Sequence, residues 1–291
     1  MRIQTFSIIA GSAACNARCP FCVSKMTPPH GVILQEPEVN WRNFRKACLL
    51  ARQSETTTAM FTGKGEPTLF PEQITKYLAV LKEFDFPLIE LQSNGIPLAE
   101  QPETYCRHLQ AWYESGLNTI AISIVHYDPE MNRKIYLPYR KEYIDLPKLI
   151  QSLHSQGFSV RLACILAHGF IGDPDGLQQL ISFAGENGVE QLTVRPVSKP
   201  ANSKSHVAED WAEAHHLPDG RVEQIREYLI SRGTLLMRLL HGAEVYDVDG
   251  QNVCLSDCLT LSETDQEIRQ LIFFPDGHLR YDWQYGGAIL L

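Results

Sequence analysis

The sequence predicts an α/β fold with a parallel sheet, arranged as an open or partial barrel. Short apolar runs of β type recur along the chain, and segments with helical apolar spacing lie between them. After the second run the strands start about 30–40 residues apart, which is typical of βα units joined by right-handed crossovers. Six such units fit in residues 1–232, too few for a closed eight-stranded barrel of roughly 250 residues. A doubly wound sheet is the competing fold, but no G-x-G-x-x-G motif follows the first run.

The predicted strands are continuous apolar runs, as expected for strands covered on both faces. They are Ile3–Ala10, Thr58–Thr62, Leu88–Ser93, Thr119–Val125, Ser159–Leu166 and Leu192–Val197. The predicted helices between and after them are Trp41–Arg52, Pro71–Phe84, Thr104–Ser115, Leu146–Gln156, Gly176–Glu186 and Arg221–Arg232. In the clearest of them Ile74, Tyr77, Leu78 and Leu81 share one face, and Pro71 opens the helix.

The βα rhythm stops in the last fifth of the chain. We therefore predict two parts, a barrel over residues 1–232 and a short C-terminal cap over residues 233–291. Within the cap, Arg269–Phe274 and His278–Trp283 are predicted to form a β-hairpin around the turn Pro275-Asp276-Gly277. The cap is too apolar and too short to be a free arm, so we expect it to pack on the barrel.

Composition excludes several classes of protein. The chain has 291 residues, 44% hydrophobic and 21% charged, which is typical of a globular protein. No apolar run approaches the roughly 18 residues of a membrane-spanning helix, and the net charge of −8 argues against an extended nucleic-acid surface. Eight cysteines are too few for a disulfide scaffold. The apolar stretch near the N-terminus is broken by Ser and Gly, so we expect no signal peptide and a cytoplasmic location.

Three of the cysteines lie close together after the first predicted strand, in the segment Cys15-Asn16-Ala17-Arg18-Cys19-Pro20-Phe21-Cys22. The spacing C-x3-C-x2-C lets three thiolates on one loop converge on one point. A structural zinc site normally has four protein ligands, whereas an iron–sulfur cluster held by three cysteines keeps one iron open for an exogenous ligand. A zinc site completed by His30 and three reduced structural thiols are the alternatives that the spacing leaves open.

The cysteine segment resembles that of the radical S-adenosylmethionine (SAM) superfamily, with Phe21 at the aromatic position of C-x3-C-x-aromatic-C. The segment Thr62-Gly63-Lys64-Gly65-Glu66-Pro67-Thr68-Leu69 resembles the family's glycine-rich G-x-G-E-P segment, and Ser93-Asn94-Gly95 is a third similarity. All three follow successive predicted strands, where the family topology places them. The resemblance covers about residues 1–200 and implies a partial (β/α)6 barrel, in agreement with the strand count.

This resemblance implies that Cys15, Cys19 and Cys22 ligate a [4Fe-4S] cluster whose open iron is chelated by SAM. In the family, an electron from the reduced cluster cleaves SAM to a 5′-deoxyadenosyl radical, which takes a hydrogen atom from the substrate. Glycines in the second segment would let the backbone approach SAM closely. The residues expected to contact SAM are Phe21, Gly63, Gly65, Glu66, Asn94, Ser123, Arg161, Val194 and Arg195.

The SAM contacts expected on the fourth, fifth and sixth predicted strands depend on single residues and not on a motif. Ser123 could bond the ribose or the carboxylate of SAM, or be an ordinary strand serine. An arginine in an apolar strand is costly unless paired, so Arg161 is expected to meet that carboxylate or a substrate anion. Val194 and Arg195 are expected near the adenine, although the glycine-bearing adenine motif of the family is not evident in Val160–Leu166.

The loop after the fourth predicted strand mixes basic and aromatic residues at the open end of the barrel. It would suit a substrate that carries a phosphate, a carboxylate or a nucleobase; a solvated helical excursion is the alternative. Tyr127 is a candidate donor of a proton or hydrogen atom. In the cap, Cys254 and Cys258 could belong to an auxiliary cluster, a redox pair or two structural thiols.

We therefore expect a radical SAM enzyme that acts on a small polar or nucleotide-like, possibly anionic, substrate. A one-electron reductant such as a flavodoxin or ferredoxin would be its partner. A peptide- or protein-modifying enzyme, including a glycyl-radical activase, is one alternative. A non-catalytic iron–sulfur or zinc-binding protein is another, and it would cleave no SAM.

Overall fold

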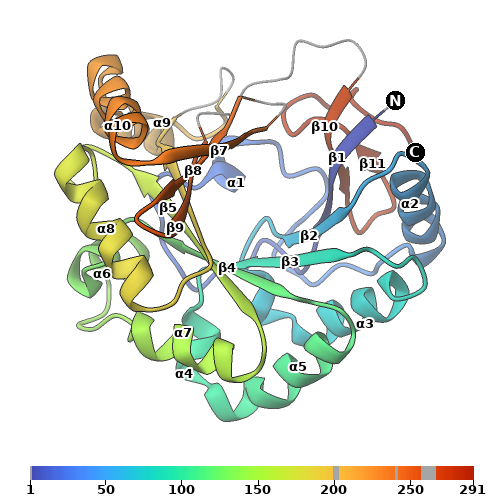
Figure 1. The fold of residues 1–291 in the computed structure, drawn as a ribbon. Coiled ribbons are helices and arrows are strands. Elements are labelled where there is room, and N and C mark those ends of the chain that lie inside the picture. Colours follow the sequence, from blue (N-terminus) through green and yellow to red (C-terminus); the bar gives the residue numbers. More distant parts are fainter. Residues whose placement is uncertain (1, 199–202, 240–241, 257–266) are drawn as a thin grey trace.

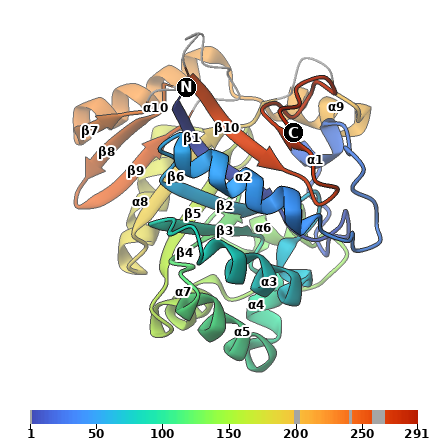
Figure 2. The same cartoon turned by 90° about the vertical axis from the view of Figure 1, so that its right-hand side faces the viewer.

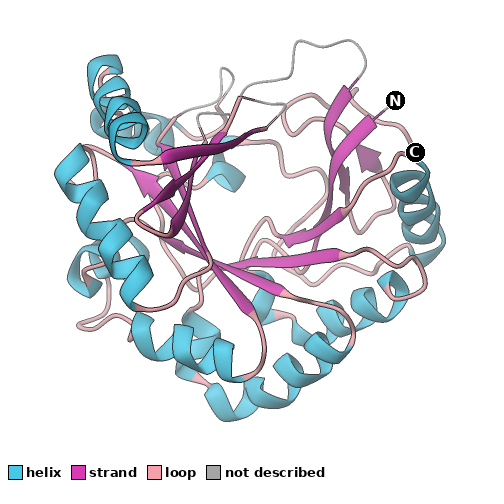
Figure 3. Ribbon diagram, in the orientation of Figure 1, coloured by secondary structure: helices cyan, strands magenta, loops and turns pink. Residues whose placement is uncertain are grey.

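The computed structural model describes all residues except 1, 199–202, 240–241 and 257–266. A curved parallel sheet runs through the molecule, and helices cover its outer side (Figures 1 and 3). Its central strands are β1 (Arg2–Ile9), β2 (Thr58–Thr62), β3 (Leu88–Ser93), β4 (Thr119–Ile124), β5 (Ser159–Leu166) and β6 (Gln191–Pro196). They are neighbours in sequence order and all parallel, so the predicted partial barrel is confirmed.

The six longer helices match the six predicted periodic segments within a few residues, whereas the shorter helices were not predicted. The longer ones are α2 (Trp41–Gln53), α3 (Pro71–Leu81), α5 (Pro102–Glu114), α7 (Leu146–Ser155), α8 (Pro174–Glu186) and α10 (Asp219–Arg232). The shorter ones are α1 (Val23–Met26), the 3₁₀ turn η1 (Pro67–Leu69), α4 (Ile96–Glu100), α6 (Pro129–Tyr136) and α9 (His206–His215).

The C-terminal part of the chain extends the sheet at both ends. Strands β7 (Thr234–Arg238), β8 (Glu244–Val248) and β9 (Gln251–Leu255) form an antiparallel set, and β9 pairs in parallel with β6. Strand β10 (Glu267–Phe273) pairs in parallel with β1, and β11 (Leu279–Arg280) closes the predicted hairpin. The sheet order is β11-β10-β1-β2-β3-β4-β5-β6-β9-β8-β7, and the sheet is not closed. Figure 2 shows β10 and β1 side by side beneath α2.

The sequence analysis expected the hairpin but not β7–β9. Three short strands in this region alternate weakly and carry charged residues, so their apolar pattern is less clear than that of the barrel strands. The strands of residues 233–291 belong to the same sheet as the barrel strands, and the division at residue 232 remains a prediction.

The two faces of the barrel strands differ in burial. On the outer face Phe6 stacks on Phe44 of α2, and Phe61 contacts Tyr77 of α3. On the inner face of β2 and β5, every second residue is only half-buried. The expectation that the strands are covered on both faces is therefore wrong for these strands, because none of the described helices covers these inner positions completely.

Candidate active site

The cysteine loop lies between β1 and α1, at the carboxyl end of the first barrel strand. Cys15 is exposed, Cys19 and Cys22 are half-buried, and Cys22 is the N-cap residue of α1. The backbone N–H of Ala17 donates to the Sγ atom of Cys15 over 3.4 Å. The loop thus turns back on itself between its first two cysteines.

The three thiols affect one another electrostatically. Although part of the Cys15 residue is exposed, the protein atoms around its sulfur displace enough water to raise the pKa of this thiol to about 11, and negative charge on Glu66 and Cys22 acts in the same direction. Burial also raises the pKa of Cys19, and charge on Cys22 and then Cys15 adds to the rise. Charge on Cys22 opposes ionisation of both Cys15 and Cys19, so the three sulfur atoms lie in one region. A cation bound there would favour the thiolate forms of Cys15 and Cys19.

The donor set determines which cofactor fits. Within the described residues, no three His, Cys, Asp or Glu side chains are grouped closely enough to hold a metal ion. Cys15, Cys19 and Cys22 are candidate ligands by their chemistry and by their position on one loop. His30, the expected fourth ligand of a zinc site, directs its Nε2 atom to the carbonyl oxygen of Trp283 at 2.9 Å and packs on Phe274. Three soft thiolates without a fourth protein ligand suit an iron–sulfur cluster with one open iron better than structural zinc.

The glycine-rich segment after β2 holds the cysteine loop in place. The backbone N–H of Glu66 donates to the carbonyl oxygen of Ala14 over 2.9 Å. A Cβ atom on Gly65 would lie 2.0 Å from that same oxygen, so only glycine fits there. At Gly63 a Cβ atom would meet the carbonyl oxygen of Ala10 at 3.1 Å, and its own carbonyl accepts from the Ser24 hydroxyl. These glycines therefore allow close contact between the two loops.

Glu66 is a buried acceptor that joins three segments. Its Oε1 atom accepts from the backbone N–H and hydroxyl of Thr68 and from the hydroxyl of Ser93. Its Oε2 atom accepts from the backbone N–H of Asn94 over 2.9 Å. Burial raises the pKa of this carboxyl, and the hydrogen bonds oppose that rise. The described contacts make Glu66 a structural anchor as well as a candidate SAM contact.

Asn94 completes the link to the cysteine loop. Its side-chain nitrogen donates to Oδ1 of Asn16 over 2.7 Å, and its own Oδ1 accepts from the backbone N–H of Ile96. The structure thus brings the three sequence motifs together through hydrogen bonds. Asn16, which lies between two of the cysteines, was not predicted to take part.

Phe21 anchors the far side of the loop. Its ring centroid lies 5.3 Å from that of Trp211 in α9 and 6.4 Å from that of Tyr136 in α6. The backbone N–H of Arg18 also donates to the carbonyl oxygen of Tyr136. These contacts hold the loop against two helices that the sequence places far from it, and the contact of Phe21 with adenine remains a prediction.

The predicted site residues on β4 and β5 line the inside of the barrel. Ser123 is half-buried on β4. Arg161 forms an ion pair with Glu90 of β3, and its Nε atom is buried with no hydrogen-bond partner among the described residues. The sequence analysis missed Glu90, although a carboxylate inside an apolar strand is itself a signal of a buried partner. Arg161 therefore has a protein anion beside it, and its contact with SAM or a substrate anion remains a prediction.

Val194 and Tyr127 have described contacts elsewhere. Val194 is fully buried on the opposite face of β6 from Arg195, and its carbonyl oxygen accepts from the backbone N–H of Ser256. The hydroxyl of Tyr127 donates to Gln179 of α8. Because α8 lies outside the sheet, Tyr127 is directed away from the barrel interior in this structure.

Of the two cysteines in the C-terminal part, Cys254 is half-buried on β9, where it is paired with Thr193 of β6. Cys258 lies outside the described residues. The structure therefore places one of the two thiols beside the last barrel strand, and the auxiliary-cluster hypothesis stays a prediction.

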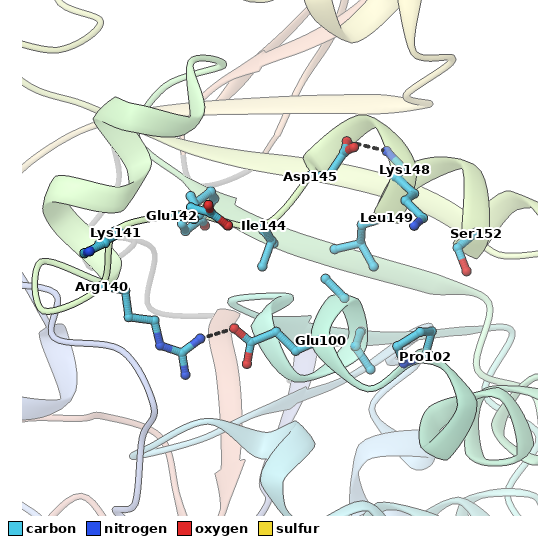
Figure 4. Close-up of a pocket in the computed structure, with 13 residues that line it drawn as sticks. Glu100, Pro102, Arg140, Lys141, Glu142, Ile144, Asp145, Lys148, Leu149 and Ser152 are labelled. Atoms are coloured by element: carbon cyan, nitrogen blue, oxygen red, sulfur yellow. Dashed lines mark hydrogen bonds and ion pairs between the residues drawn. The ribbon is translucent and has the colours of Figure 1, made fainter.

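A cavity of about 530 Å³ lies apart from the cysteine loop, between α4 and α7 (Figure 4). The Arg140–Glu100 ion pair lies at one side of it, and Lys148 and Ser152 lie at the other. None of the residues predicted to bind the cluster or SAM lines it, although Arg140 and Lys141 of the loop after β4 do. Shape alone does not mark this cavity as the active site, because the motif residues converge elsewhere.

An open parallel barrel with three thiols on the loop after its first strand is the architecture of an iron–sulfur radical enzyme. The profile of the Radical SAM superfamily matches residues 9–184, more than half of the chain. The chain belongs to the radical SAM superfamily, and it is an enzyme.

Sequence and structure comparisons give more distant relatives. The chain is 23% identical over 245 residues to a GTP 3′,8-cyclase of Shewanella denitrificans, a match that covers 84% of this chain and 64% of the relative. It therefore spans slightly less than two thirds of that protein. SuiB of Streptococcus suis, bound to SAM, has a TM-score of 0.62 at 15% identity and is covered over 62% of its length by 99% of this chain. A radical SAM methyltransferase from Sphaerobacter thermophilus has a TM-score of 0.55 at 14% identity over 95% of this chain and 70% of its own. These structures share the fold.

Within the described part of the chain, no helix combines the length and the apolar character needed to span a bilayer.

Proposed function

We propose that this chain binds a [4Fe-4S] cluster through Cys15, Cys19 and Cys22 and uses it to cleave SAM reductively. The observation that carries this proposal is the set of three cysteines on one loop that hydrogen bonds fasten to two further motifs. Three protein ligands leave one iron open, which is where the amino and carboxylate groups of SAM would bind.

When bound, the cluster supplies one electron, and cleavage of SAM gives a 5′-deoxyadenosyl radical. The protein's part is to hold the three sulfurs and to fix the neighbouring backbone. The Glu66 carboxylate fixes the segment after β2 and the start of the loop after β3 by four hydrogen bonds. The backbone of residues 63–66 and the Asn94 side chain are then positioned beside the loop, where they are proposed to contact SAM.

The proposed substrate is a small polar molecule that enters the half-buried interior of the barrel. Half-exposed polar side chains on the inner face of β2, β4 and β5 support this class, and Arg161 adds a positive charge. The GTP 3′,8-cyclase relative makes a purine nucleotide the first candidate to test. Its ring would suit the aromatic residues and its phosphates the basic residues of the loop after β4.

We place the reaction in the cytoplasm, where thiols stay reduced. A flavodoxin or ferredoxin would be the one-electron donor.

The test is anaerobic reconstitution with iron and sulfide, reduction with dithionite and incubation with SAM. We expect about four iron atoms per chain, as a cluster of this type contains, together with formation of 5′-deoxyadenosine. The variant in which all three cysteines are replaced by Ala is the control and should give neither. A protein that retains a cluster but forms no 5′-deoxyadenosine would contradict the proposal.

The substrate class is tested by isotope transfer. Purine nucleotides and small carboxylic acids, each deuterated at carbon, are incubated with the reduced enzyme and SAM. Deuterium in 5′-deoxyadenosine identifies the compound that loses the hydrogen atom. Transfer from carboxylic acids and none from nucleotides would overturn the nucleotide candidate and leave SAM cleavage intact.

A further inference from the structure

Lys64, in the middle of the glycine-rich segment, is buried although it carries a charge. Only 7% of its surface is exposed. Its ammonium donates to the hydroxyl oxygen of Thr27 over 2.7 Å and lies 5.3 Å from the centre of the Trp283 ring. The backbone of the segment directs this side chain toward α1 and the C-terminal part of the chain.

The described neighbours of Lys64 do not neutralise its charge. Among the residues that the structure describes, no ion pair or hydrogen bond joins Lys64 to an acidic side chain. The Thr27 hydroxyl is neutral and donates to the carbonyl oxygen of Val23. A cation–π contact contributes about 0.5–2 kcal/mol, which is less than the cost of removing an ammonium ion from water. A buried cation with such partners fits a site that receives an anion.

Helix α1 places that cation beside the cysteine loop. Cys22 is the N-cap residue of this helix and Thr27 is its C-cap residue, so one helical turn joins a candidate cluster ligand to the partner of Lys64. The Ser24 hydroxyl, in the same turn, donates to the carbonyl oxygen of Gly63 over 3.2 Å. Burial lowers the pKa of Lys64 to about 8, and negative charge on Cys22 acts against this fall.

The C-terminal hairpin region covers this position. The indole ring of Trp283 lies over the Lys64 ammonium, and its carbonyl oxygen is bound by Nε2 of His30 at 2.9 Å. Its ring also contacts Phe274, which directly follows β10. Because β10 pairs with β1, residues of the C-terminal hairpin region cover the charge of Lys64 in the glycine-rich segment.

We propose that Lys64 is the fixed counter-cation of the cluster held at Cys22 and that it raises the reduction potential of this cluster. The inference rests on the proposed function, since it needs a cluster at these cysteines. Three thiolates give such a cluster a net negative charge, and reduction adds one more negative charge. A nearby buried cation stabilises the reduced form more than the oxidised form, because Coulomb energy grows with the charge and is weakly screened away from water. Lys64 thus acts on the cluster through its charge and does not ligate it.

The test compares reduction potentials of reconstituted full-length variants, measured by redox titration monitored by electron paramagnetic resonance. Lys64→Gln removes the charge and keeps a donor for Thr27, and Lys64→Met removes both. We expect each to shift the reduction equilibrium about tenfold toward the oxidised cluster, which for one electron is about 59 mV. Lys64→Arg should retain the wild-type potential to within a third of that shift.

Lys25 provides the matched control. Lys25 lies in α1, on the same helical turn as Cys22 and Ser24. Its charge acts on Cys15 and Cys19, but its side chain is exposed. Solvent screens its charge, so Lys25→Met should shift the potential by much less. Equal shifts in Lys25→Met and Lys64→Gln, or no shift in Lys64→Gln, would overturn the inference.

Two further outcomes separate the possible failures. If the wild-type protein holds no cluster, the proposed function itself fails. If Lys64→Gln weakens SAM binding at an unchanged potential, Lys64 pairs with the SAM carboxylate and not with the cluster, and the inference as stated is wrong. Should Lys64→Met fail to assemble a cluster, Lys64→Gln and Lys64→Arg still decide the question, because both keep a polar group at the position.

Discussion

The predicted site residues make different kinds of contact in the two halves of the barrel. Around β1, β2 and β3, the cysteine loop, Glu66 and Asn94 are joined by short hydrogen bonds between segments far apart in sequence. Around β4, β5 and β6, Arg161, Val194 and Tyr127 are each engaged with a different protein partner. The contiguous motifs at the ends of neighbouring strands are therefore joined to one another, whereas the single residues on later strands contact other parts of the protein and their roles remain predictions.

The physical reason is the geometry of a parallel sheet. The carboxyl ends of neighbouring parallel strands meet at one edge, so loops that follow them meet regardless of the sequence between them. A residue inside a strand faces the interior or the helices according to its parity. Val194 and Arg195 are adjacent in sequence but lie on opposite faces for this reason.

The first test removes Cys19 from the cysteine loop, in the half of the barrel around β1, β2 and β3. Cys19→Ala leaves two thiolates on the loop, which cannot retain a stable [4Fe-4S] cluster, so iron content and 5′-deoxyadenosine formation should fall to background. Cys106→Ala is the matched control, because Cys106 is an exposed cysteine outside the motifs, and it should keep full iron content. Retention of the cluster in Cys19→Ala would assign the cluster to other ligands.

The second test concerns Glu66, whose hydrogen bonds join segments of that same half of the barrel. Glu66→Ala leaves four donors without their acceptor in a buried position, and we expect a loss of about 4 kcal/mol in the free energy of unfolding. Urea unfolding of the apo-protein measures it. The exposed Glu38 provides a control, since Glu38→Ala should change stability by less than about 0.5 kcal/mol. A loss of SAM binding with unchanged stability would make Glu66 a ligand only.

The third test asks whether Arg161 is structural or reserved for a ligand. Arg161→Met leaves the Glu90 carboxylate buried and unpaired, which should destabilise the fold by about 3 kcal/mol. The double variant Glu90→Leu/Arg161→Met should recover most of this loss in the same urea titration, because the charge is then gone as well. If Arg161→Met is as stable as wild type but binds SAM weakly, the two halves of the barrel are more alike than the structure indicates.

The smallest effect is expected for Glu244 on β8, a strand that extends the sheet beyond β6. Burial raises the pKa of Glu244, but hydrogen bonds from Tyr246, Arg238 and Arg226 outweigh it and hold this pKa below its usual value. A lowered pKa in the folded state stabilises the protein above the unfolded pKa, and this contribution disappears as the pH falls through the folded value. Glu244→Gln should therefore cost about 1 kcal/mol at pH 7 and almost nothing near pH 3.

Thermal unfolding of wild type and Glu244→Gln at both pH values measures this difference. A difference between wild type and Glu244→Gln that grows toward low pH would contradict the sign of the shift.

Much of the fold followed from periodicity. The six barrel strands, the six longer helices and the turn at Asp276 and Gly277 were predicted close to their observed bounds, whereas the shorter helices were not predicted. Strands β7–β9 were not, because short strands with charged residues carry little periodic signal. The open inner face was also missed, since an apolar run looks the same whether one or both of its faces are covered.

The sequence alone determined the cysteine spacing, the glycines of the second motif and the order of the βα units, because each is a local property of contiguous residues. Only the tertiary structure decided that the chain's end divides between both edges of the sheet, that Glu90 faces Arg161, and that Trp283 covers Lys64. These contacts join residues far apart in the chain. They depend on strand parity and sheet order, and neither can be obtained from a local pattern of side chains.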